Sequence, residues 1–171
     1  MRIRIGGPQD APAVLALGDE AVAWLVEQGR TGQWGTQPWT GNAGREESTS
    51  KRAASGGLRI AEDEDGTVLG AMVITPDRAT YVSAAGEPEL YINLLVTSRK
   101  QRGRGVGAAL IARARAEAAE RGLDLIRVDC FAGDDGKLVR YYESVGFTPV
   151  QKFTVREWPG QLLELRLSAS G

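Results

Sequence analysis

The chain has 171 residues, a length that predicts one domain with a substantial hydrophobic core. Apolar residues make up 42% and charged residues 25% of the chain, which excludes a disordered, collagen-like or coiled-coil protein. The 21 basic and 22 acidic side chains give a formal net charge of −1, so we expect no nucleic-acid partner. The chain has no histidine and one cysteine, which excludes His-based metal sites, His general bases and an intramolecular disulfide.

The sequence carries no evident targeting or membrane segment. Its first residues contain no apolar stretch of signal-peptide length. No run of 18 apolar residues occurs anywhere in the chain. We therefore expect a cytoplasmic protein with no membrane partner.

The first half of the chain is typical of a strand, two helices and a hairpin. Alternating and helically spaced apolar residues set the element types, and an Asp-Gly turn joins the two hairpin strands. The acidic run at 62–65 is interpreted as a solvated hairpin tip. The predicted elements are a strand at 2–5, a helix capped by Asp10 and ending at Gly29, a helix at 42–55, and strands at 58–61 and 67–75.

The second half of the chain alternates strands and helices. The predicted elements are a strand at 89–96, a helix from 106 to Gly122, a strand at 123–131, a helix at 136–145 capped by Asp135, and strands at 147–155 and 162–167 around a Pro159-Gly160 turn. This order predicts a mixed α/β sheet in a single domain over residues 1–171. The terminal strand at 162–167 is a candidate for pairing across a homodimer.

The sharpest motif is Arg-Gly-Arg-Gly-Val-Gly at 102–107, between a predicted strand and a predicted helix. Its glycines allow a tight turn and a close approach of the backbone to a ligand. The helix behind the turn offers free N–H groups and the positive end of its dipole. Arg99, Lys100, Arg102 and Arg104 add four cations. The motif therefore predicts a cradle for an anion such as a pyrophosphate.

Two nucleotide interpretations of this motif compete. Gly103, Gly105 and Ala108 fit the dinucleotide fingerprint, with Asp124 or Asp129 placed to hold a ribose. The surrounding elements argue against it, because a hairpin precedes the motif and no run of further βαβ units follows. A dinucleotide-binding oxidoreductase stays open as an alternative.

The second interpretation rests on two motifs in order. Arg102, Gly105 and Gly107 form the pattern R-x-x-G-x-G, and residues 141–147 read Y-Y-E-S-V-G-F. Both blocks, and the helix and strand between them, resemble the GNAT superfamily of acetyl-CoA-dependent N-acetyltransferases. The resemblance implies a GNAT-like fold of about seven strands, largely antiparallel with a central parallel pair, and about four helices.

The resemblance also implies a function. Acetyl-CoA would be the cofactor, and its acetyl group would pass directly to a primary amine of a small molecule or peptide in a ternary complex. The strand end at 93–96 would splay from its neighbour and hold the pantetheine arm and carbonyl through its backbone. The cofactor-binding residues implied are Leu94, Leu95, Val96, Arg102, Gly103, Arg104, Gly105, Val106 and Gly107. A non-catalytic module that senses acyl-CoA or binds a partner is the remaining alternative.

Candidates for the chemistry follow from the same motifs. By its place before Gly-Phe, Tyr142 is the candidate acid that protonates the departing thiolate. Glu89 is the candidate base, with Glu87 as an alternative, and Tyr91 shares the face of Glu89 and is a candidate acceptor contact. The resemblance implies that the loop holding Trp34 and Trp39 walls the acceptor site; the alternative is that the two rings fill the core. The lone Cys130 is interpreted as a buried, inert thiol.

Overall fold

The computed structural model describes residues 1–101 and 103–167. The described residues form two compact units, one of Met1–Ile74 with Leu94–Leu110 and one of Thr75–Asn93 with the residues from Ile111 to 167. The helices and strands are β1 (Arg2–Ile5), α1 (Ala11–Glu27), α2 (Ala43–Ala53), β2 (Leu58–Glu62), β3 (Val68–Thr75), β4 (Leu90–Thr97), α3 (Val106–Glu120), β5 (Leu125–Phe131), α4 (Lys137–Ser144), β6 (Thr148–Val155) and β7 (Trp158–Arg166). Short 3₁₀ turns at Pro8–Asp10 and Asp134–Gly136 precede α1 and α4.

The strands follow the order β1-β2-β3-β4-β5-β7-β6 in one seven-stranded sheet. The pairs β1–β2, β2–β3, β5–β7 and β6–β7 are antiparallel. Strands β4 and β5 run parallel, with Leu90 opposite Ile126 and Ile92 opposite Val128. Together with the four α-helices of the described residues, this confirms the predicted mixed sheet with a central parallel pair.

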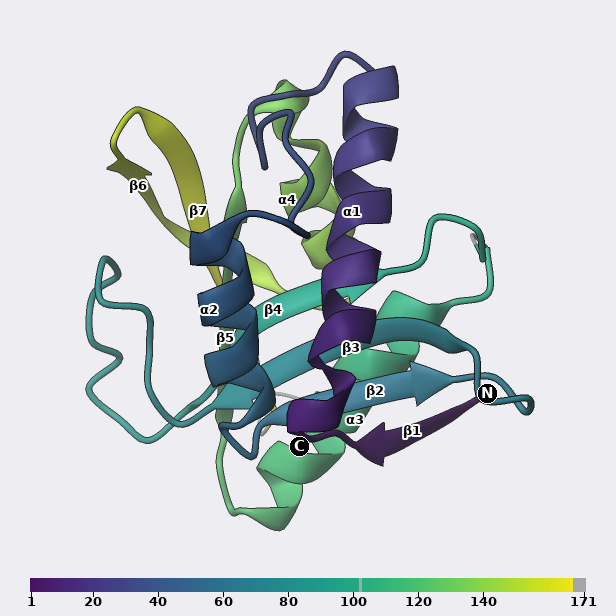
Figure 1. Cartoon of the computed structure of the whole chain (residues 1–171). Helices are drawn as coiled ribbons and strands as arrows, with labels where there is room; N and C mark the ends of the chain where they lie inside the picture. The colour runs from purple at the N-terminus through teal and green to yellow at the C-terminus, as the bar shows by residue number, and fades with distance from the viewer. Residues whose placement is uncertain (102, 168–171) are drawn as a thin grey trace. The chain divides into compact units, whose positions relative to one another are not determined.

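In the first unit, α1 and α2 lie over the β2–β3 part of the sheet (Figure 1). Their core joins Val14 and Leu17 of α1 to Ala71 and Val73 of β3. Gly70, directly before Ala71 in β3, faces the other side. A Cβ on Gly70 would lie 2.8 Å from the Val106 side chain, so the missing side chain lets the start of α3 pack closely against β3.

The long loop between α1 and α2 is fastened to α1 through Trp39. The Trp39 side chain is 1% exposed, and its ring lies directly against Gly18, where a Cβ would approach it to 2.2 Å. The Asp19 carboxylate accepts hydrogen bonds from the Trp39 N–H and from the backbone and hydroxyl of Thr40. One helix turn thus supplies both the space for the ring and the acceptor for the loop backbone.

In the second unit, the turn of the β6–β7 hairpin lies at a different place from the one predicted. The turn between β6 and β7 is at Arg156 and Glu157, whose φ angles are +48° and +72°, and Pro159-Gly160 lies inside β7. Gly160 is required in the strand, because a Cβ there would lie 2.3 Å from the Phe153 ring. The glycine therefore makes room for a ring across the hairpin instead of making the turn.

Three further expectations are wrong in detail. Asp135 does not cap α4, because it lies within the preceding 3₁₀ turn at φ +59° and the N-cap is Gly136. The terminal strand has no free edge for a homodimer, because β7 pairs with β5 on one side and β6 on the other. Asp10 is at the N-cap of α1, but its carboxylate accepts from the Gly7 N–H and the Arg4 guanidinium.

The contact between Gly18 and Trp39 predicts a site-specific loss of stability. Gly18→Ala would overpack a buried ring, which costs about 1–3 kcal/mol, and the gain in helix propensity of about 1 kcal/mol offsets part of it. Urea unfolding should therefore show a lower free energy of unfolding for this variant. Gly44→Ala in α2 is the control, because its new Cβ would meet only the Asn42 side chain at 3.5 Å. Equal effects of the two variants would contradict the described packing.

Candidate functional site

The glycine-rich loop of the first unit connects β4 to the N-terminus of α3. Gly103 and Gly105 have φ angles of +83° and +70°, the left-handed region that favours glycine. The Gly105 carbonyl accepts from the Ala109 N–H at 3.0 Å, so helical hydrogen bonding begins at this glycine. The N–H groups of the first helical turn have no intrahelical acceptor, which makes this turn suited to an anion. Arg102, predicted to contact the pyrophosphate, lies outside the described residues.

Helix α1 supports the chain just before this loop. The Glu20 carboxylate accepts from the Ser98 hydroxyl at 2.9 Å and from the Arg99 N–H at 3.2 Å. The Arg99 guanidinium lies 3.7 Å from the centroid of the Trp24 ring, also on α1. Sequence reasoning missed Glu20, because it is 78 residues from Ser98 and lies in an ordinary helical pattern.

Arg104 has an acidic partner in the same unit. Its guanidinium donates to both carboxylate oxygens of Asp63, at 2.9 and 3.3 Å, and to the Gln101 side chain at 3.2 Å. The guanidinium lowers the pKa of Asp63 to about 2. Asp63 of the acidic hairpin tip thus pairs with Arg104, which was predicted to contact a pyrophosphate.

The candidate site residues at the end of β4 and the two candidate tryptophans lie largely in the core of the first unit. Leu94 and Val96 of β4 are buried, and Leu95 between them is half-buried. The Trp34 and Trp39 rings meet edge to face with centroids 5.1 Å apart. Trp39 fills the core, while Trp34 packs against it from a partly buried position. An acceptor contact by either ring stays a prediction.

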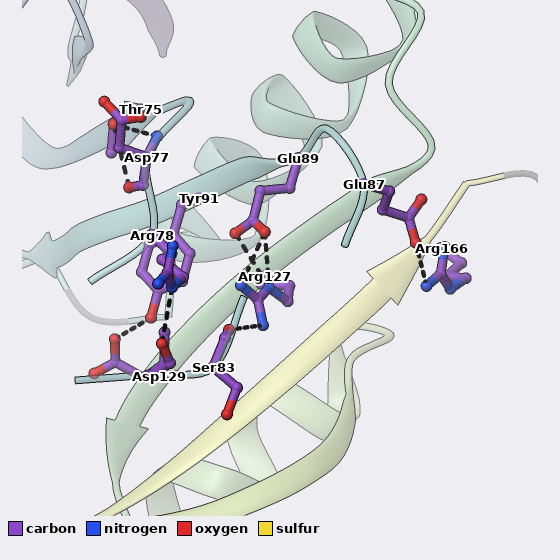
Figure 2. Close-up of polar contacts among 11 residues, drawn as sticks. Thr75, Asp77, Arg78, Ser83, Glu87, Glu89, Tyr91, Arg127, Asp129 and Arg166 are labelled. Carbon is purple, nitrogen blue, oxygen red and sulfur yellow. Dashed lines mark hydrogen bonds and ion pairs between the residues drawn. The ribbon is translucent and has the colours of Figure 1, made fainter. Parts of the chain in front are cut away.

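In the second unit, Glu89 forms a buried ion pair with Arg127 of β5 (Figure 2). The Arg127 Nε donates to both carboxylate oxygens at 3.1 Å, and a terminal nitrogen donates to one of them at 2.8 Å. The other terminal nitrogen donates to the Ser83 carbonyl at 3.0 Å. The candidate base is therefore also the anchor of an arginine that fastens the loop at 76–88.

Tyr91 lies on the same face of the parallel strand pair. Its hydroxyl donates a short hydrogen bond to Asp129 of β5, as Figure 2 shows, and the Tyr81 hydroxyl donates to the other oxygen at 3.0 Å. Burial, together with the charge of Asp129, raises the pKa of Tyr91. The Tyr91 ring is fully buried, with Val82 and Leu162 as neighbours. Sequence reasoning placed Tyr91 on the right face but missed its pairing with Asp129 and Tyr81.

Tyr142 is buried on α4. Its ring meets those of Tyr141 and Phe147 edge to face, with centroids 5.3 and 5.7 Å away. Burial raises the pKa of the Tyr142 phenol, so the hydroxyl stays protonated at neutral pH. Cys130 is also buried, which raises the pKa of its thiol to about 12 and makes it a poor nucleophile.

Neither a membrane span nor a metal cluster is found in the described part of the chain. None of its helices is both long and apolar enough to cross a membrane. No group of three or more acidic or cysteine side chains in residues 1–101 and 103–167 could hold a metal ion.

Comparison with known families identifies the class of protein. The model of the acetyltransferase (GNAT) family matches residues 19–147. The chain therefore belongs to the GNAT family and is an acetyltransferase by that membership, as the two sequence motifs predicted. No curated protein sequence matches the chain significantly.

Solved structures share the fold over nearly the whole chain. A GNAT-family acetyltransferase from Listeria monocytogenes 4b F2365 has a TM-score of 0.76 at 23% identity, covering 97% of this chain and 94% of the other. The ribosomal-protein-alanine N-acetyltransferase from Brucella melitensis has a TM-score of 0.67 at 23% identity, covering 98% and 100%. The yncA protein from Salmonella typhimurium, described as an acetyltransferase and solved with its cofactor acetyl-CoA, has a TM-score of 0.65 at 19% identity, covering 98% and 94%.

The buried pair predicts that Glu89 matters for stability. Glu89→Gln would leave the buried Arg127 charge without its carboxylate, which costs on the order of 3 kcal/mol. Thermal or urea unfolding checks the loss. Glu87→Gln is the matched control, because Glu87 pairs with Arg166 at an exposed position, where ion pairs contribute little. If the Glu89 variant were as stable as the control, the pair would not hold the loop and strand together.

Proposed function

We propose that the chain transfers the acetyl group of acetyl-CoA to a primary amine of a small molecule or peptide, directly and in a ternary complex. The family match carries the proposal, because it includes both the glycine-rich loop and the tyrosine motif that ends at Phe147. The family match also favours acetyl transfer over the hydride transfer of a dinucleotide-binding oxidoreductase. A non-catalytic acyl-CoA sensor is distinguished by its lack of turnover.

The loop and the strand end before it would hold the cofactor. The left-handed backbone at Gly103 and Gly105 and the first N–H groups of α3 suit the two charges of a pyrophosphate. Arg102 would add a guanidinium, and Arg104 would do so by exchanging Asp63 for a phosphate oxygen. The backbone of Leu94, Leu95 and Val96 would hold the pantetheine arm and polarise the thioester carbonyl.

Acetyl-CoA would supply an activated acyl carbon with a thiolate leaving group. The ammonium form of the amine must lose one proton before its lone pair forms the new C–N bond, and the nitrogen loses a second proton to solvent as the C–S bond breaks. Glu89 would accept a proton from the amine, directly or through water, and it would have to loosen its contact with Arg127 to do so. Tyr142 would donate the phenol proton to the departing sulfur. The phenol carries its proton at neutral pH, as a proton donor must.

Tyr142→Phe tests the proposed acid. The variant keeps the ring and removes the proton donor, so we expect kcat to fall about a hundredfold, within the range for general acid catalysis. The affinity for acetyl-CoA, measured by calorimetry, should change less than about twofold. The reason is that the phenol donates its proton to sulfur only in the transition state, after acetyl-CoA has bound. Tyr141→Phe is the control on the same helix and should keep its turnover. Unchanged turnover in the Tyr142 variant would remove this residue from the mechanism.

A further inference from the structure

Two hydrogen-bond donors of the first unit lie next to each other, and both lack an acceptor. The Arg45 guanidinium of α2 lies 4.9 Å from the centroid of the Trp39 ring. Within residues 1–101 and 103–167, this guanidinium takes part in no hydrogen bond or ion pair. The Trp39 indole N–H is buried and has no hydrogen-bond partner in that part of the chain either. A donor that leaves water without gaining an acceptor costs free energy, so one acceptor placed here would stabilise both groups.

The acidic side chains of the two helices in this unit that could serve Arg45 are used by other groups. On α2 itself, Glu46 accepts from the N–H of a loop glycine at 3.2 Å, and Glu47 pairs with Lys51 at 3.2 Å. Asp19 of α1 accepts from the backbone of the loop that carries the tryptophan ring. These contacts explain why a helix with two glutamates leaves one of its arginines without a carboxylate.

The charge at this place is positive and partly removed from water. Arg45 is half-buried, and Arg52 lies seven residues, about two helical turns, further along the same face of α2. Burial, together with the charge of Arg52, lowers the pKa of the Arg45 guanidinium. A half-buried cation that is repelled by a second cation is costly to keep unless an anion neutralises it. The acceptor that suits these two donors is therefore negatively charged.

The Trp39 ring relates the two donors to the proposed chemistry. It belongs to the same hydrophobic core as Leu94 and Val96 of β4, the strand end proposed to hold the thioester. This core lies between the sheet and the layer of α1 and α2 (Figure 1). Trp34 packs against Trp39 from a half-buried position and offers an apolar surface beside the donors. The two donors therefore lie in the same unit, and around the same core, as the cofactor-binding strand end.

We propose that Arg45 and Trp39 bind an oxyanion of the acceptor, which is a primary amine that also carries a carboxylate or a phosphate. This inference rests on the proposed function and names its substrate class. A guanidinium donates two parallel hydrogen bonds to either oxyanion, and the indole N–H supplies one more donor. An amine without an oxyanion leaves both donors without an acceptor. Arg45 is thus a specificity-determining residue, and the adjacent indole adds to its selectivity.

The test compares matched amines and measures binding apart from transfer. The full chain, saturated with CoA so that the glycine-rich loop is occupied, is titrated in a calorimeter with two pairs of amines. L-phenylalanine against L-phenylalaninamide tests a carboxylate, and O-phosphoethanolamine against ethanolamine tests a phosphate. In at least one pair, we expect the amine with the oxyanion to bind at least about tenfold more tightly, since it gains charged hydrogen bonds.

Three variants assign that preference to the two donors. Arg45→Gln should reduce it to less than about twofold, because the guanidinium is lost. Lys51→Gln removes the same charge from an exposed position on the same helix and should keep the preference. Trp39→Phe keeps an aromatic ring without the indole N–H and should weaken the amine with the oxyanion about threefold.

Each outcome supports or overturns the oxyanion site. Equal binding within both pairs, no binding of either amine with an oxyanion, or a preference that survives in a folded Arg45→Gln protein would overturn it. Thermal melting establishes that the variants are folded. If Arg45→Gln does not fold, Arg45→Lys keeps the charge without the planar fork and should lower the preference about threefold, and an unchanged preference would overturn the site.

Transfer is followed separately, as release of CoA thiol from acetyl-CoA in the presence of the same four amines. The expected binding preference without any thiol release would contradict the proposed function and leave the oxyanion site in place. Thiol release at equal rates with both members of each pair would support the proposed function and overturn the oxyanion site. The two proposals therefore fail in distinguishable ways.

Discussion

The Glu89–Arg127 ion pair is the constraint on which the second unit depends. Both side chains are buried, so each has lost the hydration that stabilises a charge in water. Three hydrogen bonds between them, and a fourth to the Ser83 carbonyl, offset that loss. Because Glu89 directly precedes β4 and Arg127 is on β5, the pair fixes the parallel strands and the loop at 76–88 at once. The face carrying Tyr91, Asp129 and Tyr81 depends on that loop position.

The first unit uses carboxylates differently, to place cations and backbone around the glycine-rich loop. Glu20 binds the chain just before the loop, and Asp63 binds Arg104 within it. Glu20 lies on α1 and Asp63 lies in the turn between β2 and β3. The loop is therefore supported from α1 and from the β2–β3 hairpin. Strain at Gly103 and Gly105 is absent, because glycine adopts positive φ at little cost.

Local patterns explain what the sequence predicted well. Alternation, helical spacing and the two motifs located the seven strands and four helices of the described residues and the glycine-rich loop, since these signals depend on neighbours in the chain. The failures involve long-range contacts. Pro159-Gly160 has the composition of a turn, but Gly160 is needed for the Phe153 ring across the hairpin. No local signal could show that Glu89 faces Arg127, 38 residues away, or that Asp129 accepts from Tyr81, 48 residues away.

The central claim is that the loop at 103–107 binds acetyl-CoA, and calorimetric titration tests it most directly. The wild-type chain is titrated with acetyl-CoA, NADH and NADPH, beside Gly105→Glu and Gly29→Glu. The two glycines have the same φ of +70°, so the variants share the strain and the added charge, and only one of them alters the loop. We expect saturable binding of acetyl-CoA alone, lost in Gly105→Glu and kept in Gly29→Glu. Binding of a nicotinamide nucleotide instead, or acetyl-CoA binding that survives in Gly105→Glu, would contradict it.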